Sequence, residues 1–233
     1  MLLSRGLAAL TFITLFSFSL NAEYLYKDDV VNNPKFAEQI NAIGTELKAK
    51  TGVSLYLVMT QDVDENQSIA DFEKQIASQV AEPAVIMTFI EQKQEIDILA
   101  RPVSLYKHFN KAQILSPNAT FIGSVVSAIM FARSYDEAKE LIANRGGTIL
   151  PILAEKTKGS ETVQKYSVAM YNGYSDTADQ IAAAQGVTLS SSAGNGSQNF
   201  IDLIRLIFYG IILYGISRYV YGRFFRPKKD NNV

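Results

Sequence analysis

The chain has 233 residues, with 22 basic and 23 acidic side chains, one histidine, no cysteine and no tryptophan. A chain without cysteine has no disulfide, no thiolate metal site and no cysteine nucleophile. Residues 23–199 hold 15 basic and 21 acidic side chains, a net charge of −6, which argues against nucleic-acid binding through phosphate neutralisation.

The first 22 residues have the pattern of a secretory signal peptide. Arg5 precedes an uncharged apolar run that ends at Leu20, and small residues follow. We expect cleavage after Ala22, with cleavage after Ser19 as the alternative. An uncleaved anchor is the other interpretation, but the run is short for a membrane span.

The next segment predicts a helix followed by a strand. Asn33 and Pro34 are typical of a helix start, and Gly52 is typical of a helix end. The apolar residues between them recur at helical spacing: Phe36, Ile40, Ile43 and Leu47. Residues 53–59 then alternate as in a strand.

A second helix and a strand hairpin are expected next. Ser68 and Asp71 form a capping box at the helix start, and Pro83 ends the segment. Residues 84–90 are apolar throughout, as in a central strand covered on both faces. Residues 95–101 return as its antiparallel partner, whereas the strand–helix–strand unit before them predicts parallel neighbours.

The rest of the domain is expected to be helical. Helices are predicted over residues 104–115, from the capping box at Ser134 to Gly146, and over residues 160–172 and 175–185. The run at residues 119–132 is apolar but too short for a span. We expect it to be a buried core helix; the alternative is a face that contacts a partner or the membrane.

The segment at residues 200–222 predicts a transmembrane helix. It is long enough to cross the hydrocarbon core, and its centre carries no charge between Arg205 and Arg218. A buried helix of a soluble core is the alternative. Basic residues crowd its C-terminal side: Arg218, Arg223, Arg226, Lys228 and Lys229. The positive-inside rule therefore predicts a cytoplasmic tail over residues 223–233.

The sequence thus predicts an α/β domain over residues 23–187, with a small mixed β-sheet sandwiched by helices and a helical C-terminal extension. A flexible linker over residues 188–199 and a single C-terminal transmembrane helix would follow. We expect this domain on the periplasmic side of a bacterial inner membrane, with the C-terminus in the cytoplasm.

This order of parts resembles the TPM-domain family of exported, membrane-anchored proteins. The resemblance rests on Asp28 and Asp29 before the first helix, on Thr51 and Gly52 at its end, and on the strand that follows. It covers roughly residues 24–150. The chain lacks the Trp-x-x-Gly, Asn-Asn-Gly and Gly-x-Gly-Leu-Glu motifs of the family, so it resembles a divergent member. The resemblance implies either an assembly or repair factor for membrane complexes or a phosphatase.

Carboxylates near the end of the first predicted strand are candidate metal ligands. Asp62 and Asp64 follow residues 53–59, and Asp28 or Asp29 is a candidate third ligand for calcium or magnesium. The spacing from Asp62 also approaches an EF-hand loop, but Gln67 replaces its glycine.

No residue pattern specifies a catalytic site or an organic cofactor. His108 is the single histidine, and no Gly-x-Ser-x-Gly motif accompanies it, so we expect a surface histidine on a helix. Two hypotheses follow. The first is a non-enzymatic accessory, assembly or quality-control factor that binds envelope or membrane proteins. The second is a metal-dependent phosphatase.

Overall fold

The computed structural model describes residues 23–192 and five isolated positions, namely Ile212, Tyr214, Ser217, Arg218 and Tyr221. The predicted signal peptide, most of the predicted transmembrane segment and the basic tail lie outside the described residues. Among the helices of the described part, none combines the length and the hydropathy that crossing a membrane requires.

The described residues form a mixed α/β fold around a four-stranded sheet. Its elements are β1 (Leu25–Asp28), α1 (Pro34–Thr51), β2 (Ser54–Thr60), α2 (Ile69–Ala77), β3 (Ala84–Ile90) and β4 (Glu95–Arg101). The remaining elements are helical: η1 (Val103–Lys107), α3 (Lys111–Ile114), α4 (Phe121–Phe131), α5 (Tyr135–Ala143), α6 (Leu150–Leu153) and α7 (Ser160–Ala184). Helices cover both faces of the sheet, as the sequence predicts.

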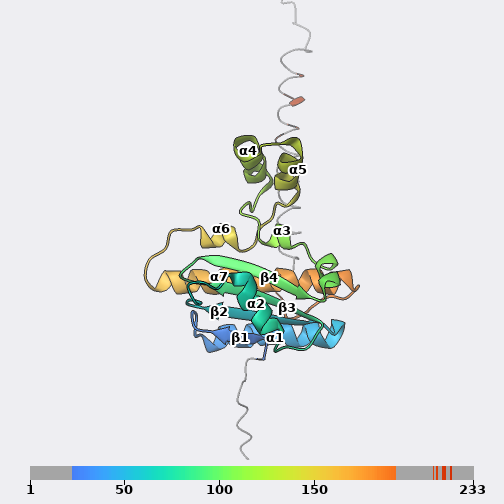
Figure 1. Cartoon of the computed structure of the whole chain (residues 1–233). Coiled ribbons are helices and arrows are strands. Elements are labelled where there is room, and N and C mark those ends of the chain that lie inside the picture. Colours follow the sequence, from blue (N-terminus) through green and yellow to red (C-terminus); the bar gives the residue numbers. More distant parts are fainter. Residues whose placement is uncertain (1–22, 193–211, 213, 215–216, 219–220, 222–233) are drawn as a thin grey trace, which may run out of the picture.

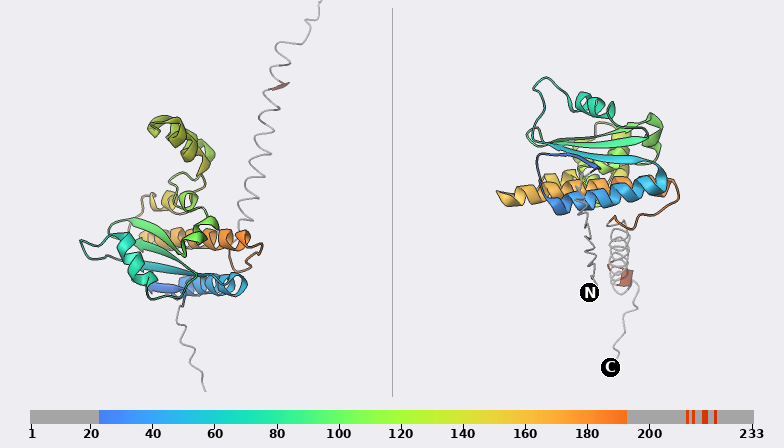
Figure 2. Two further views of the ribbon diagram at one scale, coloured as in Figure 1. Left: turned by 45° about the vertical axis from the view of Figure 1, so that its right-hand side comes forward. Right: turned by 90° about the horizontal axis from the view of Figure 1, so that it is seen from below.

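The strands lie in the order β1-β2-β3-β4. The first three are parallel, and β4 returns antiparallel to β3, which confirms the predicted crossover and hairpin. Figure 2 shows α1 and α7 side by side on one face of the sheet and α2 on the other. Every residue of β3 is buried, as expected for a central strand.

The helix starts form as predicted. The Asn33 side chain accepts a hydrogen bond from the backbone N–H of Lys35, and Gly52 ends α1 with a φ of 74°. Ser68 accepts from the N–H of Asp71 at the start of α2, which confirms the capping box.

The short edge strand β1 is absent from the prediction. It has four residues, of which only Leu25 is buried, so its hydrophobic pattern is too short to detect.

The main core lies between the sheet and the pair α1 and α7. Gly44 allows their close approach, because a Cβ atom there would lie 2.3 Å from the Tyr24 ring and 2.6 Å from the Tyr174 hydroxyl. The two helices predicted over residues 160–185 are in fact the single helix α7. Gly173 does not interrupt α7; it makes room for Ile149, whose Cδ1 atom would lie 2.2 Å from an added Cβ.

The first residues of the predicted flexible linker are bound to the domain. The Glu46 carboxylate on α1 accepts hydrogen bonds from the backbone N–H groups and hydroxyls of Ser190 and Ser191, at 2.5 to 2.9 Å. Lys50 also pairs with Glu46 and donates to the carbonyl of Thr188. These first residues are therefore held against α1, because the Glu46 carboxylate is a charged acceptor for the serine N–H groups. The linker over residues 188–199 stays a prediction.

Candidate functional site

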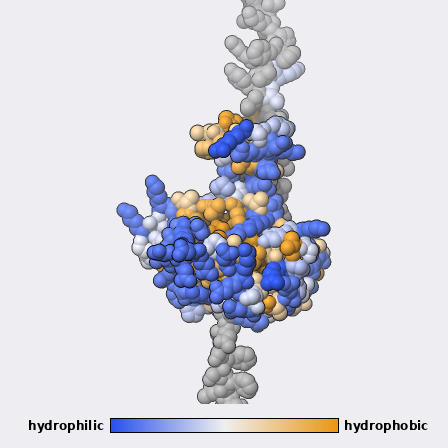
Figure 3. Space-filling model, viewed as in Figure 1, coloured by the Kyte–Doolittle hydropathy of each residue, from blue (hydrophilic) through white to orange (hydrophobic). Residues whose placement is uncertain are grey.

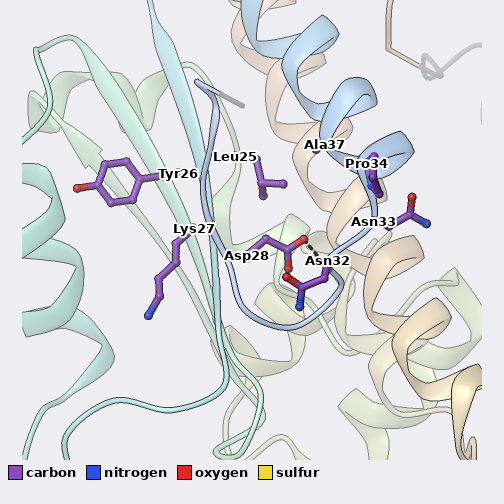
Figure 4. A pocket seen from close by; sticks show the side chains of 8 residues that line it. All are labelled: Leu25, Tyr26, Lys27, Asp28, Asn32, Asn33, Pro34 and Ala37. Carbon is purple, nitrogen blue, oxygen red and sulfur yellow. Dashed lines mark hydrogen bonds between the residues drawn. The ribbon is translucent and has the colours of Figure 1, made fainter. Parts of the chain in front are cut away.

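The carboxyl ends of β1 and β2 meet at one edge of the sheet, as expected for parallel strands. Asp28 at the end of β1 lies opposite Met59 near the end of β2. Beside Asp28 is an open hollow of about 310 Å³ (Figure 4). It is lined by Leu25, Tyr26, Lys27, Asp28, Asn32, Asn33, Pro34 and Ala37. Asp62 and Asp64 are not part of this lining.

The Asp28 carboxylate is used by the turn between β1 and α1. Its Oδ1 atom accepts from the N–H groups of Val30 and Val31 at 3.1 and 2.7 Å, and its Oδ2 atom accepts from that of Asn32 at 2.9 Å (Figure 4). Asn32 has a φ of 50°, so the chain reverses sharply here. Asp28 thus shapes the entry to α1 by satisfying three backbone donors.

The carboxylates of Asp29 and Asp62 at this edge also have protein partners. Asp29 forms an ion pair with Lys27 at 2.8 Å, and Lys27 also donates to the Thr60 hydroxyl. The Asp62 carboxylate accepts a hydrogen bond from the backbone N–H of Val63. The backbone carbonyl of Asp64 accepts one from the backbone N–H of Gln67, which closes a turn.

No set of three or more histidine, aspartate or glutamate side chains gathers as a metal site within the described residues. Asp28, Asp62 and Asp64 therefore do not form a three-ligand site there, and divalent-cation binding stays a prediction. The EF-hand alternative also does not fit the geometry, because Glu73, its twelfth position, lies on the face of α2 that packs on the sheet, with an exposed fraction of 1%.

A buried glutamate, Glu73, lies between α2 and the sheet, beside the partly buried Asp97, and its burial was not predicted from the sequence. Burial, and then the charge of Asp97 on β4, raise the pKa of Glu73 to about 8. Asp97 forms an ion pair with Lys111. Within the described residues, Oε1 of Glu73 and Oγ1 of Thr88 have no hydrogen-bond partner. The available signal was the position of Glu73 three residues before Ile76, on the buried face of α2.

His108 directly follows η1 and is half-buried, and none of the described residues bonds to its Nδ1 atom. It is therefore less exposed than the sequence suggests, and it follows a 3₁₀-helix.

The most exposed apolar surface of the described chain lies on the hairpin formed by α4 and α5. This hairpin projects from the body of the domain (Figures 1 and 2). Ile122, Val126, Ile129 and Met130 are 62, 49, 78 and 68% exposed. Their spacing places them on one face of α4. We call these four residues the apolar stripe.

The burial predicted for residues 119–132 is wrong. Helix α4 packs mainly against α5, and only Ser124 and Ala128 of α4 are buried. The sheet is already covered by α1, α7 and α2 (Figure 2), and α4 projects from the body instead of packing on the sheet (Figure 1). In Figure 3, apolar residues reach the surface on the α4 side of the hairpin. Hydropathy alone did not distinguish this surface from a core helix.

No protein-family model matches the chain, and no curated protein is similar to it in sequence. The resemblance to the TPM-domain family therefore stays a prediction that rests on the order of elements and on the residues quoted for it.

Proposed function

We propose that this chain is a membrane-anchored, extracytoplasmic domain of the TPM type. Its function is that of a non-enzymatic accessory, assembly or quality-control factor for membrane or envelope protein complexes. The observation that carries this proposal is the exposed apolar stripe on α4. An uncovered apolar surface on a projecting hairpin is typical of a contact site with a protein or a membrane.

Two of the four candidate carboxylates at the sheet edge, Asp28 and Asp29, are engaged by protein groups, which favours a contact function over catalysis. Asp28 holds three backbone N–H groups, and Asp29 is neutralised by Lys27. Carboxylates with such partners are poorly placed to hold a cation for phosphate-ester hydrolysis, since the metal would have to displace them.

The predicted topology agrees with this role. An export signal and an anchor at residues 200–222 would hold the acidic domain beside the bacterial inner membrane, on its periplasmic side. Tethering raises the effective concentration of the domain near membrane-embedded partners.

The test is amine-reactive cross-linking of the full chain in the membranes of cells that produce it. We expect a reproducible set of membrane proteins to be cross-linked to the wild type. The yield should fall several-fold when Ile122, Ile129 and Met130 are replaced together by serine. It should be unchanged in the control variant Val103→Ser/Val163→Ser, which alters exposed apolar residues outside the hairpin.

Two results together would contradict the proposal. The purified full chain would hydrolyse a phosphate ester in a metal-dependent reaction that is lost in the double variant Asp62→Ala/Asp64→Ala, and no cross-linked partner would be reproducible.

A further inference from the structure

The apolar stripe is an uncovered surface, and its shape favours lipid as the medium that covers it. We propose that α4 lies in the extracytoplasmic interface of the lipid bilayer that anchors the chain, so that the hairpin is a second membrane attachment. This inference rests on the proposed function, because it requires the predicted C-terminal anchor.

The exposed apolar side chains of α4 form a convex surface. Besides the stripe, Phe121 and Phe131 at the two ends of the helix are 56 and 67% exposed. The helix is buried only at two small residues, Ser124 and Ala128. A projecting helix that is apolar over most of its circumference fits a medium that surrounds it, such as lipid, better than one concave protein groove.

The charge distribution of the hairpin separates an apolar helix from a charged one. Residues 112–132 contain no charged side chain, whereas α5 and its two flanks carry all the charges of the hairpin. These are Arg133, Asp136, Glu137, Lys139, Glu140 and Arg145. With α4 among the lipid headgroups and acyl chains, the Lys139 side chain of α5 can extend to the aqueous side.

Aromatic residues accompany this boundary. The Arg145 guanidinium lies 5.4 Å from the centroid of the Phe121 ring, and Tyr135 at the start of α5 is 82% exposed. An arginine on an aromatic ring and an exposed tyrosine at the start of α5 are residue types typical of the membrane interface.

The length of α4 and the tether agree with a helix in the interface. With 11 residues, α4 is about 16 Å long, too short to cross the hydrocarbon core. Because residues 188–192 are bound to α1 and α7, only residues 193–199 separate the domain from the predicted anchor. Seven residues span at most about 25 Å, so the domain remains beside the bilayer.

Electrostatic attraction is not the source of this binding. The hairpin has three basic and three acidic residues, and residues 23–199 have a net charge of −6. We therefore expect α4 to attach to the surface of zwitterionic phosphatidylcholine vesicles. It should persist when the salt is raised from about 0.01 M to about 1 M, which shortens the screening length from about 30 Å to about 3 Å.

The chain has no cysteine, so single cysteines can be introduced for labelling. The full chain carrying Ile129→Cys is labelled with an environment-sensitive fluorophore and reconstituted in phosphatidylcholine vesicles that contain brominated lipid. The matched control carries Val103→Cys, because Val103 on the body is 76% exposed and Ile129 is 78% exposed.

Bromine on the acyl chains should quench the label at position 129 roughly fivefold more than that at position 103, because an interfacial helix sits at the headgroup and acyl boundary. Adding Ile122→Ser and Met130→Ser should remove most of this difference. Equal quenching at the two positions would overturn the inference. If quenching is equal but the hairpin still determines cross-linking to membrane proteins, the lipid inference fails and the proposed function stands.

Discussion

The hydroxyl of Tyr174, in the middle of α7, donates a hydrogen bond to the carbonyl oxygen of Leu55 in β2 at 2.7 Å. Tyr174 is fully buried, and burial raises its pKa well above the ordinary value for tyrosine. This bond connects the last helix of the domain to the second strand of the sheet, across 119 positions of the chain.

Tyr174→Phe should destabilise the domain by about 1 to 1.5 kcal/mol, because it removes one buried hydrogen bond and leaves the ring in place. Thermal unfolding of the full chain in detergent should show a midpoint lowered by about 2 to 6 °C. Tyr135→Phe is the matched control, since Tyr135 is 82% exposed, and its midpoint should not change. An unchanged midpoint for Tyr174→Phe would contradict the role of this bond.

The buried carboxyl of Glu73 makes stability depend on pH. Its pKa is raised to about 8, so the folded state holds the proton more tightly than the unfolded chain, where a glutamate titrates near pH 4.5. The stabilisation from the protonated form is complete below about pH 4.5 and is lost as the pH rises through 8.

Glu73→Gln should therefore stabilise the fold by roughly 2 to 4 kcal/mol at pH 8.5 and by less than about 1 kcal/mol at pH 5. Urea unfolding at the two pH values measures this difference. A gain of equal size at both pH values would show that Glu73 does not titrate in this range.

Exposure of α4 has a direct consequence for stability. Ile129→Ala should change the free energy of unfolding by no more than about 0.5 kcal/mol, because Ile129 is 78% exposed. Ile40→Ala should cost about 2 to 5 kcal/mol, because Ile40 is fully buried in the main core. Similar costs for the two variants would place α4 in a core and contradict the fold described.

Asp28 should behave as a structural residue of the turn before α1. Asp28→Ala leaves three backbone N–H groups without their acceptor and should cost about 1 to 3 kcal/mol, whereas Asp28→Asn keeps one acceptor oxygen and should cost less.

Calcium or magnesium should leave the thermal midpoint of the wild type unchanged. A rise that requires Asp28, Asp62 and Asp64 would instead establish the predicted cation site.

Much of the central fold follows from local sequence signals. Asn33, Ser68 and Ser134 form the predicted helix caps, and the apolar run at β3 forms the expected central strand. These signals work because capping and alternation depend on neighbouring residues.

The features that the sequence does not predict depend on contacts between distant segments. Helix α4 is exposed because other helices already cover the sheet, and Ser190 binds Glu46 from 144 positions away. Glu73 is buried because its helix packs on β3 and β4. In the candidate site, parallel strand ends do bring Asp28 close to the end of β2, but the backbone groups that engage its carboxylate are visible only in the folded turn.

The most direct measurement for the central claim is the rate of maleimide labelling in intact membranes of single cysteines at positions 129 and 103, each normalised to the urea-unfolded chain. If the apolar stripe is a contact surface, Cys introduced by Ile129→Cys should react roughly tenfold more slowly than that introduced by Val103→Cys, because a partner or lipid excludes water from the thiolate. Equal rates would show that α4 is uncovered at the membrane, and would contradict the proposed function.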